Sequence, residues 1–302
     1  MNRMLRYSML LMPVALVLAL VPRVAAHAQE GFTKTVFFTA LDKEGKAVTD
    51  FDASELAVAE DGKIRPAISA KRATSPLSIV MLADTSAAVG ATSGTAAGEV
   101  IRDIRDAFSA FAKQMLAANP KNELALMEFG QASIMITNFT SSGDDLEKGV
   151  NRLVSKPNAP SVLLEAIMES SKELGKRPNA RRAIVAVNME PSDEQSREPE
   201  KNIMKEMAKD RPMLFSVSLQ KGSLSNSSRG PVLEAFADKT GGKRDVIVGQ
   251  SALVNILKGY GDILNAQYEL QYSRPAGAPP QLLQMATKRT GLKFYASKFP
   301  PQ

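Results

Sequence analysis

The chain has 302 residues, a formal net charge of +6 and 44% hydrophobic residues, enough for one large domain or a domain with a smaller partner. It contains no cysteine, which excludes disulfide bonds and cysteine nucleophiles. Its single histidine, His27, lies close to the N-terminus.

The first 28 residues have the pattern of a secretory signal peptide. Arg3 and Arg6 precede an apolar run over residues 9–21, and small residues end the segment at Ala26 and Ala28. This pattern predicts cleavage after Ala28 and a secreted or periplasmic protein. The alternative of a retained membrane anchor stays open, although the apolar run is short for a bilayer span.

Cleavage there would remove His27, three arginines and no acidic residue, and the net charge would fall from +6 to +3. So small a charge argues against nucleic acid as a partner. The loss of the imidazole excludes Ser-His-Asp catalysis and zinc sites built on histidine. A metal would have to be a hard cation held by oxygen atoms. No later stretch is apolar for long enough to span a membrane.

Residues 29–74 are predicted to form an N-terminal β segment. Three strands are expected there: 35–40, 55–59 and 64–70. Pro66 suggests that the third of them is an edge strand, because proline cannot donate a ladder hydrogen bond. A unit of this size buries too little surface to be confidently stable alone.

Residues 75–266 alternate strands with helices. The apolar run 77–84 ends on a carboxylate and is typical of a strand buried on both faces. Further strands are expected over 123–129, 133–139, 182–187, 212–219 and 246–248. Helices are expected over 101–115, 144–153, 161–174, 203–209, 231–239 and 251–264, and a Ser/Gly-rich loop over 222–230. This alternation predicts a mainly parallel sheet with helices on both faces.

Residues 267–302 regain β character as a C-terminal β segment. Strands are expected over 268–272, 282–286 and 292–296. We expect this segment to pair with residues 29–74 in one small accessory β unit, because neither piece buries enough apolar surface by itself.

Polar residues gather where the parallel strands should end, and such edges hold the sites of open α/β sheets. The residues in question are Asp84, Thr85 and Ser86 after the first strand, Ser161 before a helix, and Asn188, Glu190 and Asp193 after Val187.

In the order and spacing of these pieces the chain resembles the von Willebrand factor A fold. More narrowly, it resembles the secreted bacterial von Willebrand factor A-related domain family, over nearly the whole chain after the signal segment. Four further pieces carry the resemblance: Glu60-Asp61-Gly62-Lys63, Arg181-Arg182-Ala183-Ile184-Val185, Thr240-Gly241-Gly242 and Gln267-Tyr268-x-Leu270-x-Tyr272. The resemblance implies a Rossmann-like α/β domain with a metal-ion-dependent adhesion site.

In that site, oxygen ligands from separate loops hold Mg²⁺ or a similar ion, and one position stays open for an acidic group of a partner. The resemblance implies Asp84, Ser86 and Ser161 as the ligands in this chain. Ala88 stands where the second serine belongs and Met189 where the aspartate belongs, so two ligand groups are lost.

The site is therefore expected to be degenerate, since Mg²⁺ needs both charge and octahedral geometry. Glu190 or Asp193 could substitute for the missing carboxylate. We expect no cofactor and leave open a weak binding of Mg²⁺ or Mn²⁺.

We expect a non-enzymatic interaction or adhesion module that recognises a protein or surface polymer through Thr85, Glu190 and Asp193. One alternative is a structural or assembly component of the cell envelope. A third is a hydrolase without histidine, in which Ser86 would be the nucleophile. Asp84 is only two residues from Ser86, too close in sequence for a relay by themselves.

Overall fold

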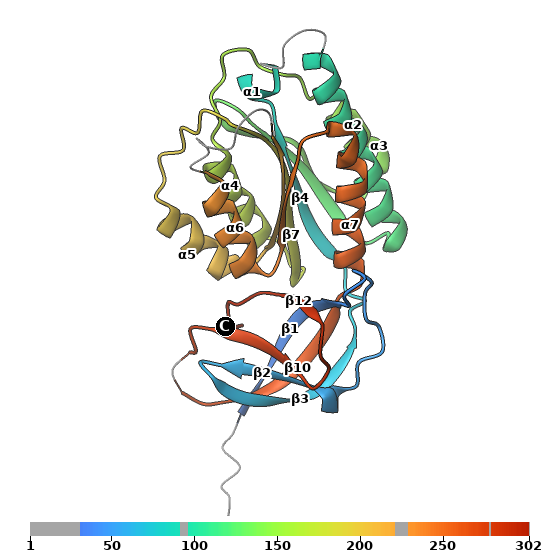
Figure 1. The fold of residues 1–302 in the computed structure, drawn as a ribbon, viewed down its shortest axis with the longest axis vertical. Helices are drawn as coiled ribbons and strands as arrows, with labels where there is room; N and C mark the ends of the chain where they lie inside the picture. Colours follow the sequence, from blue (N-terminus) through green and yellow to red (C-terminus); the bar gives the residue numbers. More distant parts are fainter. Residues whose placement is uncertain (1–30, 91–95, 221–228, 278, 302) are drawn as a thin grey trace, which may run out of the picture.

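The computed structural model describes residues 31–90, 96–220, 229–277 and 279–301. An α/β domain lies above a separate β-sheet (Figure 1). The predicted signal peptide, residues 1–28, lies outside the described residues. In the described part, no helix combines the length and the apolar character needed to cross a membrane.

The upper domain is built on a six-stranded sheet with the order β6-β5-β4-β7-β8-β9. Every neighbouring pair is parallel except β5 with β6, so the predicted mainly parallel sheet is confirmed. Its strands are β4 (Leu77–Asp84), β5 (Glu123–Phe129), β6 (Ser133–Thr140), β7 (Arg181–Glu190), β8 (Met213–Gln220) and β9 (Lys243–Ile247).

Strand β4 lies at the centre of this sheet, and all eight of its residues are buried. Successive side chains point to opposite faces, so Ile79 and Met81 join one apolar core while Val80 and Leu82 join the other. A strand buried on both faces reads as a continuous apolar run, which is the pattern its sequence shows.

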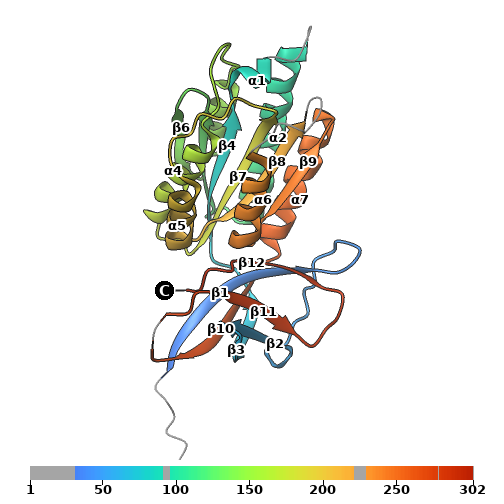
Figure 2. The same ribbon diagram turned by 60° about the vertical axis from the view of Figure 1, so that its left-hand side comes forward.

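Helices cover both faces of the sheet, as Figures 1 and 2 show. The first face is covered by α2 (Ala96–Ala118), α3 (Gly143–Asn151) and α7 (Leu253–Asn265). The second is covered by α4 (Leu163–Gly175), α5 (Glu200–Asp210) and α6 (Arg229–Thr240). A single short turn, α1 (Ala87–Gly90), follows β4 at the upper edge.

The lower sheet is antiparallel and takes strands from both ends of the chain, in the order β11-β2-β3-β10-β1-β12. These are β1 (Gly31–Leu41), β2 (Leu56–Glu60), β3 (Lys63–Arg72), β10 (Tyr268–Pro275), β11 (Leu283–Thr287) and β12 (Lys293–Ala296). The edges approach each other, since Leu283 N–H donates to the Lys298 carbonyl at 2.9 Å. The sequence predicts a small β unit, whereas the structure shows a nearly closed sheet of six strands.

The prediction that Pro66 marks an edge strand is wrong, because β3 lies between β2 and β10. Pro66 pairs with Ala57 of β2. The pairing of β3 with β10 runs only as far as Ala67. Pro66 therefore lies just beyond the ladder on that side, where its missing N–H is not required.

Polar contacts fix the lower sheet to the upper domain. The Arg181 guanidinium, at the start of β7, donates to Gln267 Oε1 at 2.8 Å. Thr39 Oγ1 in β1 donates to the Ile263 carbonyl in α7 at 2.6 Å. Lys298 N–H donates to the Lys239 carbonyl at the end of α6, at 2.9 Å. The two bodies are thus joined at the amino ends of the parallel strands, which leaves the opposite edge free.

Candidate functional site

The carboxyl edge of the upper sheet brings the predicted ligand residues together. Asp84 is the last residue of β4, and Ser86 follows it in the chain. Ser161 precedes α4 and is also fully buried. Strand β7 runs to Glu190, beyond the predicted end at residue 187, so Met189 belongs to a strand and not to a loop.

Asp84 organises the backbone around it. Its Oδ1 accepts the Ser86 N–H at 2.8 Å, and its Oδ2 accepts the Met189 N–H at 2.9 Å. Burial raises the pKa of the Asp84 carboxyl, and the nearby positive charge of Arg229 opposes that rise. Both carboxylate oxygens therefore already accept hydrogen bonds from the protein's own backbone.

A buried arginine lies at the centre of this edge. Arg229 is the first residue of α6 and is only 3% exposed. Its Nη1 donates to Ser161 Oγ at 2.7 Å and to Glu194 Oε2 at 2.8 Å. Its Nη2 donates to the Met189 carbonyl. One guanidinium thus ties the Ser161 segment to the end of β7 and the loop after it, while its charge acts on Asp84.

The residues present do not fit a divalent cation. The Met189 side chain is buried in the apolar core, and Ala88 supplies no side-chain oxygen. Within the described ranges, no group of three or more histidine, cysteine, aspartate or glutamate side chains could hold a metal ion. Ser86 Oγ is buried without a hydrogen-bond partner among the described residues and would suit an ion. The guanidinium, however, already supplies positive charge there and donates to Ser161 Oγ.

The loop after β7 is fastened to the segment before α4. Ser161 N–H donates to the Asp193 carbonyl, and Gln195 N–H donates to the Ser161 carbonyl, each at 2.7 Å. Glu194 lies between these two bonds and accepts from Arg229. These contacts give the edge a defined shape.

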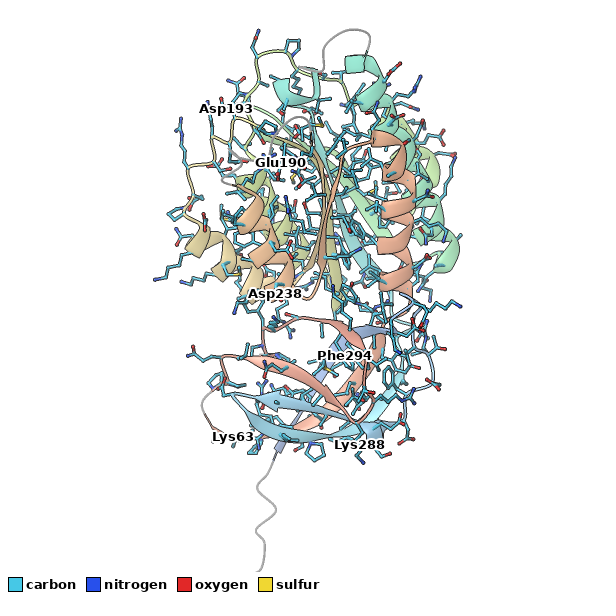
Figure 3. The ribbon with its side chains drawn as sticks, in the orientation of Figure 1. Lys63, Glu190, Asp193, Asp238, Lys288 and Phe294 are labelled. Carbon is cyan, nitrogen blue, oxygen red and sulfur yellow. The ribbon has the colours of Figure 1, made fainter. Side chains whose placement is uncertain are left out.

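The predicted binding residues differ in their exposure. Thr85 is buried, and its Oγ1 donates to the Phe129 carbonyl at 3.1 Å. Glu190 is buried as well, and its carboxylate lies 3.2 Å from the Arg244 guanidinium. Asp193 is exposed on the outer loop, as Figure 3 shows. Of the three, only Asp193 is placed where a partner could contact its side chain directly.

Sequence reasoning missed Arg229 and Glu194. Arg229 falls inside the stretch 222–230, which is predicted as a Ser/Gly-rich loop, and an arginine there reads as a solvated charge. Cations are also unfavourable at a helix N-terminus, where the helix dipole is positive. The one signal was indirect. Because two metal-ligand positions are lost, a buried Asp84 needs a positive charge from another source, which here is Arg229.

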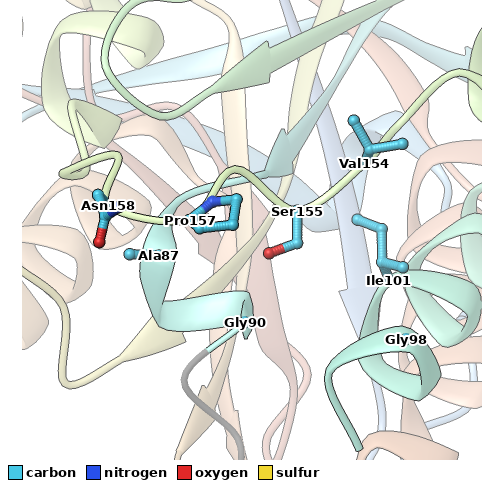
Figure 4. A pocket seen from close by; sticks show the side chains of 8 residues that line it. All are labelled: Ala87, Gly90, Gly98, Ile101, Val154, Ser155, Pro157 and Asn158. Carbon is cyan, nitrogen blue, oxygen red and sulfur yellow. The ribbon is translucent and has the colours of Figure 1, made fainter.

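A pocket of about 550 Å³ opens beside the same edge (Figure 4). It is lined by Ala87, Gly90, Gly98, Ile101, Val154, Ser155, Pro157 and Asn158. Its walls are mostly apolar, and Val154 is 53% exposed. A side chain at Gly90 would place its Cβ 2.8 Å from Ser155 Oγ, so glycine allows the close packing of this wall.

Comparison with known proteins gives matches in structure alone. No protein-family model matches the chain, and no curated protein matches it. Among solved structures, proximal thread matrix protein 1 from the mussel byssus matches 63% of the chain with a TM-score of 0.52 and 14% identity. The PilB minor pilin from Streptococcus sanguinis, as its D319A mutant, matches 65% with a TM-score of 0.50 and 10% identity.

Solved von Willebrand factor A domains match as well. One from Catenulispora acidiphila covers 91% of this chain and 74% of its own, with 9% identity and a TM-score of 0.49. The upper domain has a von Willebrand factor A fold. The matches span 48% of the byssus protein and 62% of the pilin, so they concern parts of those proteins. At identities of 9–14%, the likeness between this chain and these structures is a likeness of fold alone.

Proposed function

We propose that this chain is a non-enzymatic binding module that recognises a protein or surface polymer outside the cytoplasm without a bound metal ion. Recognition would use the carboxyl edge of the von Willebrand factor A domain, through the exposed loop at Asp193 and the pocket beside Pro157. The observation that carries the proposal is Arg229, whose guanidinium supplies a buried positive charge at this edge.

The surroundings of Ser86 support a non-enzymatic role. Ser86 is the nucleophile that a hydrolase would need, but it is buried. Asp84 accepts a hydrogen bond from the Ser86 backbone N–H, and Ser86 Oγ has no hydrogen-bond partner among the described residues. Without an adjacent base the hydroxyl is a weak nucleophile. We infer that Asp84 and Ser86 shape the loop and do not catalyse a reaction.

The names of the matched structures favour a role outside the cell. One is a matrix protein of the mussel byssus thread, and the other is a minor pilin. Such neighbours also support the second candidate, a structural or assembly component of the envelope. A stoichiometric complex that survives high salt would favour this second candidate over a reversible binding module.

Capture of envelope proteins on the immobilised chain tests the proposal, performed in Mg²⁺ and again in EDTA. We expect the same captured proteins in both buffers. Asp193→Lys should weaken the capture, because it reverses a charge on the exposed loop. Asp144→Lys makes the same charge change in α3. Because α3 begins after the end of β6 that pairs with the amino end of β5, Asp144 lies away from the carboxyl edge of the sheet. This control variant should leave capture unchanged.

Two outcomes would count against the proposal. Capture that EDTA abolishes would refute recognition without a metal ion. Equal capture by the Asp193→Lys variant and the unaltered chain would show that the loop around Asp193 is not the contact surface.

A further inference from the structure

A second pocket, of about 490 Å³, lies at the opposite end of the von Willebrand factor A domain, where the lower sheet meets it. The upper domain lines it with Ala180, Arg181, Arg182, Arg211 and Met213. Strand β1 contributes residues 33–37 and β10 contributes Glu269. The rest of the wall comes from Ser75, Gln267, Ser297, Phe299 and Pro301. The pocket is thus shared between two bodies whose mutual contacts are fixed by hydrogen bonds.

The lining of this pocket is strongly cationic. Four of its side chains are basic, namely Lys34, Arg181, Arg182 and Arg211, and Glu269 is its one acidic side chain. Glu269 also lies 3.5 Å from Lys71. Positive charge therefore exceeds negative charge in a partly enclosed space, where charges are less screened than on an open surface.

Two of the arginines are held by neutral acceptors. Arg181 donates to Gln267 Oε1 at 2.8 Å and to the Leu264 carbonyl at 2.7 Å. Arg182 donates to the Asn179 carbonyl at 2.9 Å and the Asp210 carbonyl at 3.0 Å. Burial, together with the charge of Arg72, lowers the pKa of Arg181 to about 10. These carbonyl and amide oxygens orient the two guanidinium groups. The carboxylates of Glu269 and Asp210 act on Arg181 and Arg182 only through their charge and accept no hydrogen bond from them.

Arg211 differs, because its guanidinium makes no hydrogen bond or ion pair with any residue in the described part of the chain. Its backbone is left-handed, with φ 54° and ψ 42°, and caps α5 by donating to the Met207 carbonyl at 2.8 Å. Burial lowers the pKa of Arg211, and the charges of Arg182 and Arg274 act in the same direction. A half-buried guanidinium thus keeps five N–H donors without acceptors, next to other cations.

We propose that this pocket binds a small molecule carrying an oxyanion, either a carboxylate or a phosphate group, with Arg211 as its principal ligand. A guanidinium presents parallel N–H groups that match the oxygens of both kinds of group. The volume falls in the range of small-molecule sites. Because the lining comes from both bodies, the bound anion stabilises the contact between the lower sheet and the von Willebrand factor A domain.

Calorimetric titration of the purified chain with inorganic phosphate, and separately with succinate, tests this site at constant ionic strength. We expect the unaltered chain to bind at least one of them with a Kd below about 1 mM. The tighter of the two identifies the group that the site prefers. Arg211→Met and Arg211→Asn should each weaken that Kd by about tenfold or more, because the charge-assisted hydrogen bonds are lost.

Asparagine is included because it tolerates the left-handed backbone found at Arg211, so at least one variant keeps the local fold. The matched control is Arg102→Asn, which removes an exposed arginine from α2. It should leave the Kd unchanged. Failure of the unaltered chain to bind either anion would overturn the proposal. So would equal weakening by the Arg102 and Arg211 variants, or unchanged binding in both Arg211 variants.

Discussion

Arg229 is the residue on which the chemistry of the carboxyl edge depends. Its guanidinium lies among Ser161, Glu194 and the Met189 carbonyl, and its charge acts on the buried Asp84. Burying such a cation costs desolvation free energy. Replacing it costs more, because its buried carboxylate partners would then lack a compensating charge. The edge therefore holds a fixed positive charge that belongs to the chain itself.

Replacing Arg229 should destabilise the protein strongly. In Arg229→Met the buried Asp84 and the mostly buried Glu194 would lose their cationic neighbour, and we expect a loss of about 3–5 kcal/mol in the free energy of unfolding. Urea denaturation measures this loss. Arg102→Met, at an exposed position, should change stability by less than about 0.5 kcal/mol. Equal stability of the two variants would show that Arg229 is not an essential partner of the carboxylates.

The raised pKa of Asp84 predicts a specific pH dependence. The folded protein binds this proton more tightly than the unfolded chain, whose ordinary value is 3.8. The contribution of Asp84 to stability is therefore most favourable below 3.8 and falls as the pH rises from there through the folded pKa, by at most about 1.4 kcal/mol per pH unit.

Asp84→Asn should remove this slope, so that the variant becomes more stable relative to the unaltered chain as the pH rises. Urea denaturation of both proteins at a series of pH values from 4 to 7 provides the comparison. A difference in stability that stays constant over this range would contradict a raised pKa at Asp84. Asparagine can accept only one of the two hydrogen bonds that Asp84 accepts from backbone N–H groups. That loss lowers the stability of the variant by the same amount at every pH, so it does not create a slope.

Sequence reasoning could place Asp84, Ser86 and Ser161 at one edge, because the carboxyl ends of parallel strands lie side by side. It could not place Arg229. Whether an arginine at a helix start turns inward depends on acceptors from distant segments, here Ser161 and Glu194. No local pattern records that arrangement.

At the scale of elements, the end of α6 is fitted closely to the C-terminal segment. Gly241 has φ 77°, and a Cβ there would lie 2.1 Å from the carbonyl carbon of Ala296. The neighbouring Lys298 N–H donates to the Lys239 carbonyl. The Thr240-Gly241-Gly242 sequence thus ends a helix and also lets the chain after β12 approach it.

Gly241→Ala should be far more harmful than the same change at Gly45. Both glycines have φ 77°, but Gly45 has open space around it. We expect Gly45→Ala to cost about 1 kcal/mol from backbone strain alone. Gly241→Ala should cost about 3 kcal/mol, because overpacking is added to the strain. Similar urea midpoints for the two variants would show that the contact with Ala296 carries little energy.

Most elements follow from local patterns, since β4 and β5 begin and end where their apolar runs predict. Strand β7 was predicted too short. Its last residues, Asn188 and Glu190, are polar, and they are buried only because Ser218 and Arg244 give them partners. The position of β3 inside its sheet was also missed, since it depends on where the pairing with β10 stops.

At the scale of the whole molecule, the two ends of the chain share the lower sheet. Strand β10 lies between β3 and β1, and its Leu270 and Tyr272 are buried in the core of that sheet. The aromatic rings of Phe38 and Tyr268 stack there with centroids 5.5 Å apart. The N-terminal strands therefore depend on residues more than two hundred positions later in the sequence.

Removing residues 267–302 should unfold what remains of this sheet. The truncation deletes β10, β11 and β12, and each large apolar side chain that loses its burial costs about 1.5–3 kcal/mol. We expect a lower urea midpoint and rapid proteolysis within residues 31–72. A truncated chain as resistant to urea as the full chain would contradict a dependence of the N-terminal strands on the C-terminal segment.

The small size of the two terminal segments predicts that they share one β unit, but it does not predict the order of the six strands or their registers. The six-stranded order requires long-range registers such as Val36 with Leu270. Such registers are set by side chains from both ends of the chain, and neither segment reveals them alone. The boundaries at residues 74 and 266 stay predictions.

Metal titration of the purified chain tests most directly whether Arg229 makes the carboxyl edge independent of a metal ion. Calorimetry with Mg²⁺ and with Mn²⁺ should detect no binding tighter than about 1 mM, because the residues at this edge do not supply the charge and geometry that such ions need. Tighter binding that disappears in Asp84→Ala would show instead that Asp84, Ser86 and Ser161 still hold a metal ion.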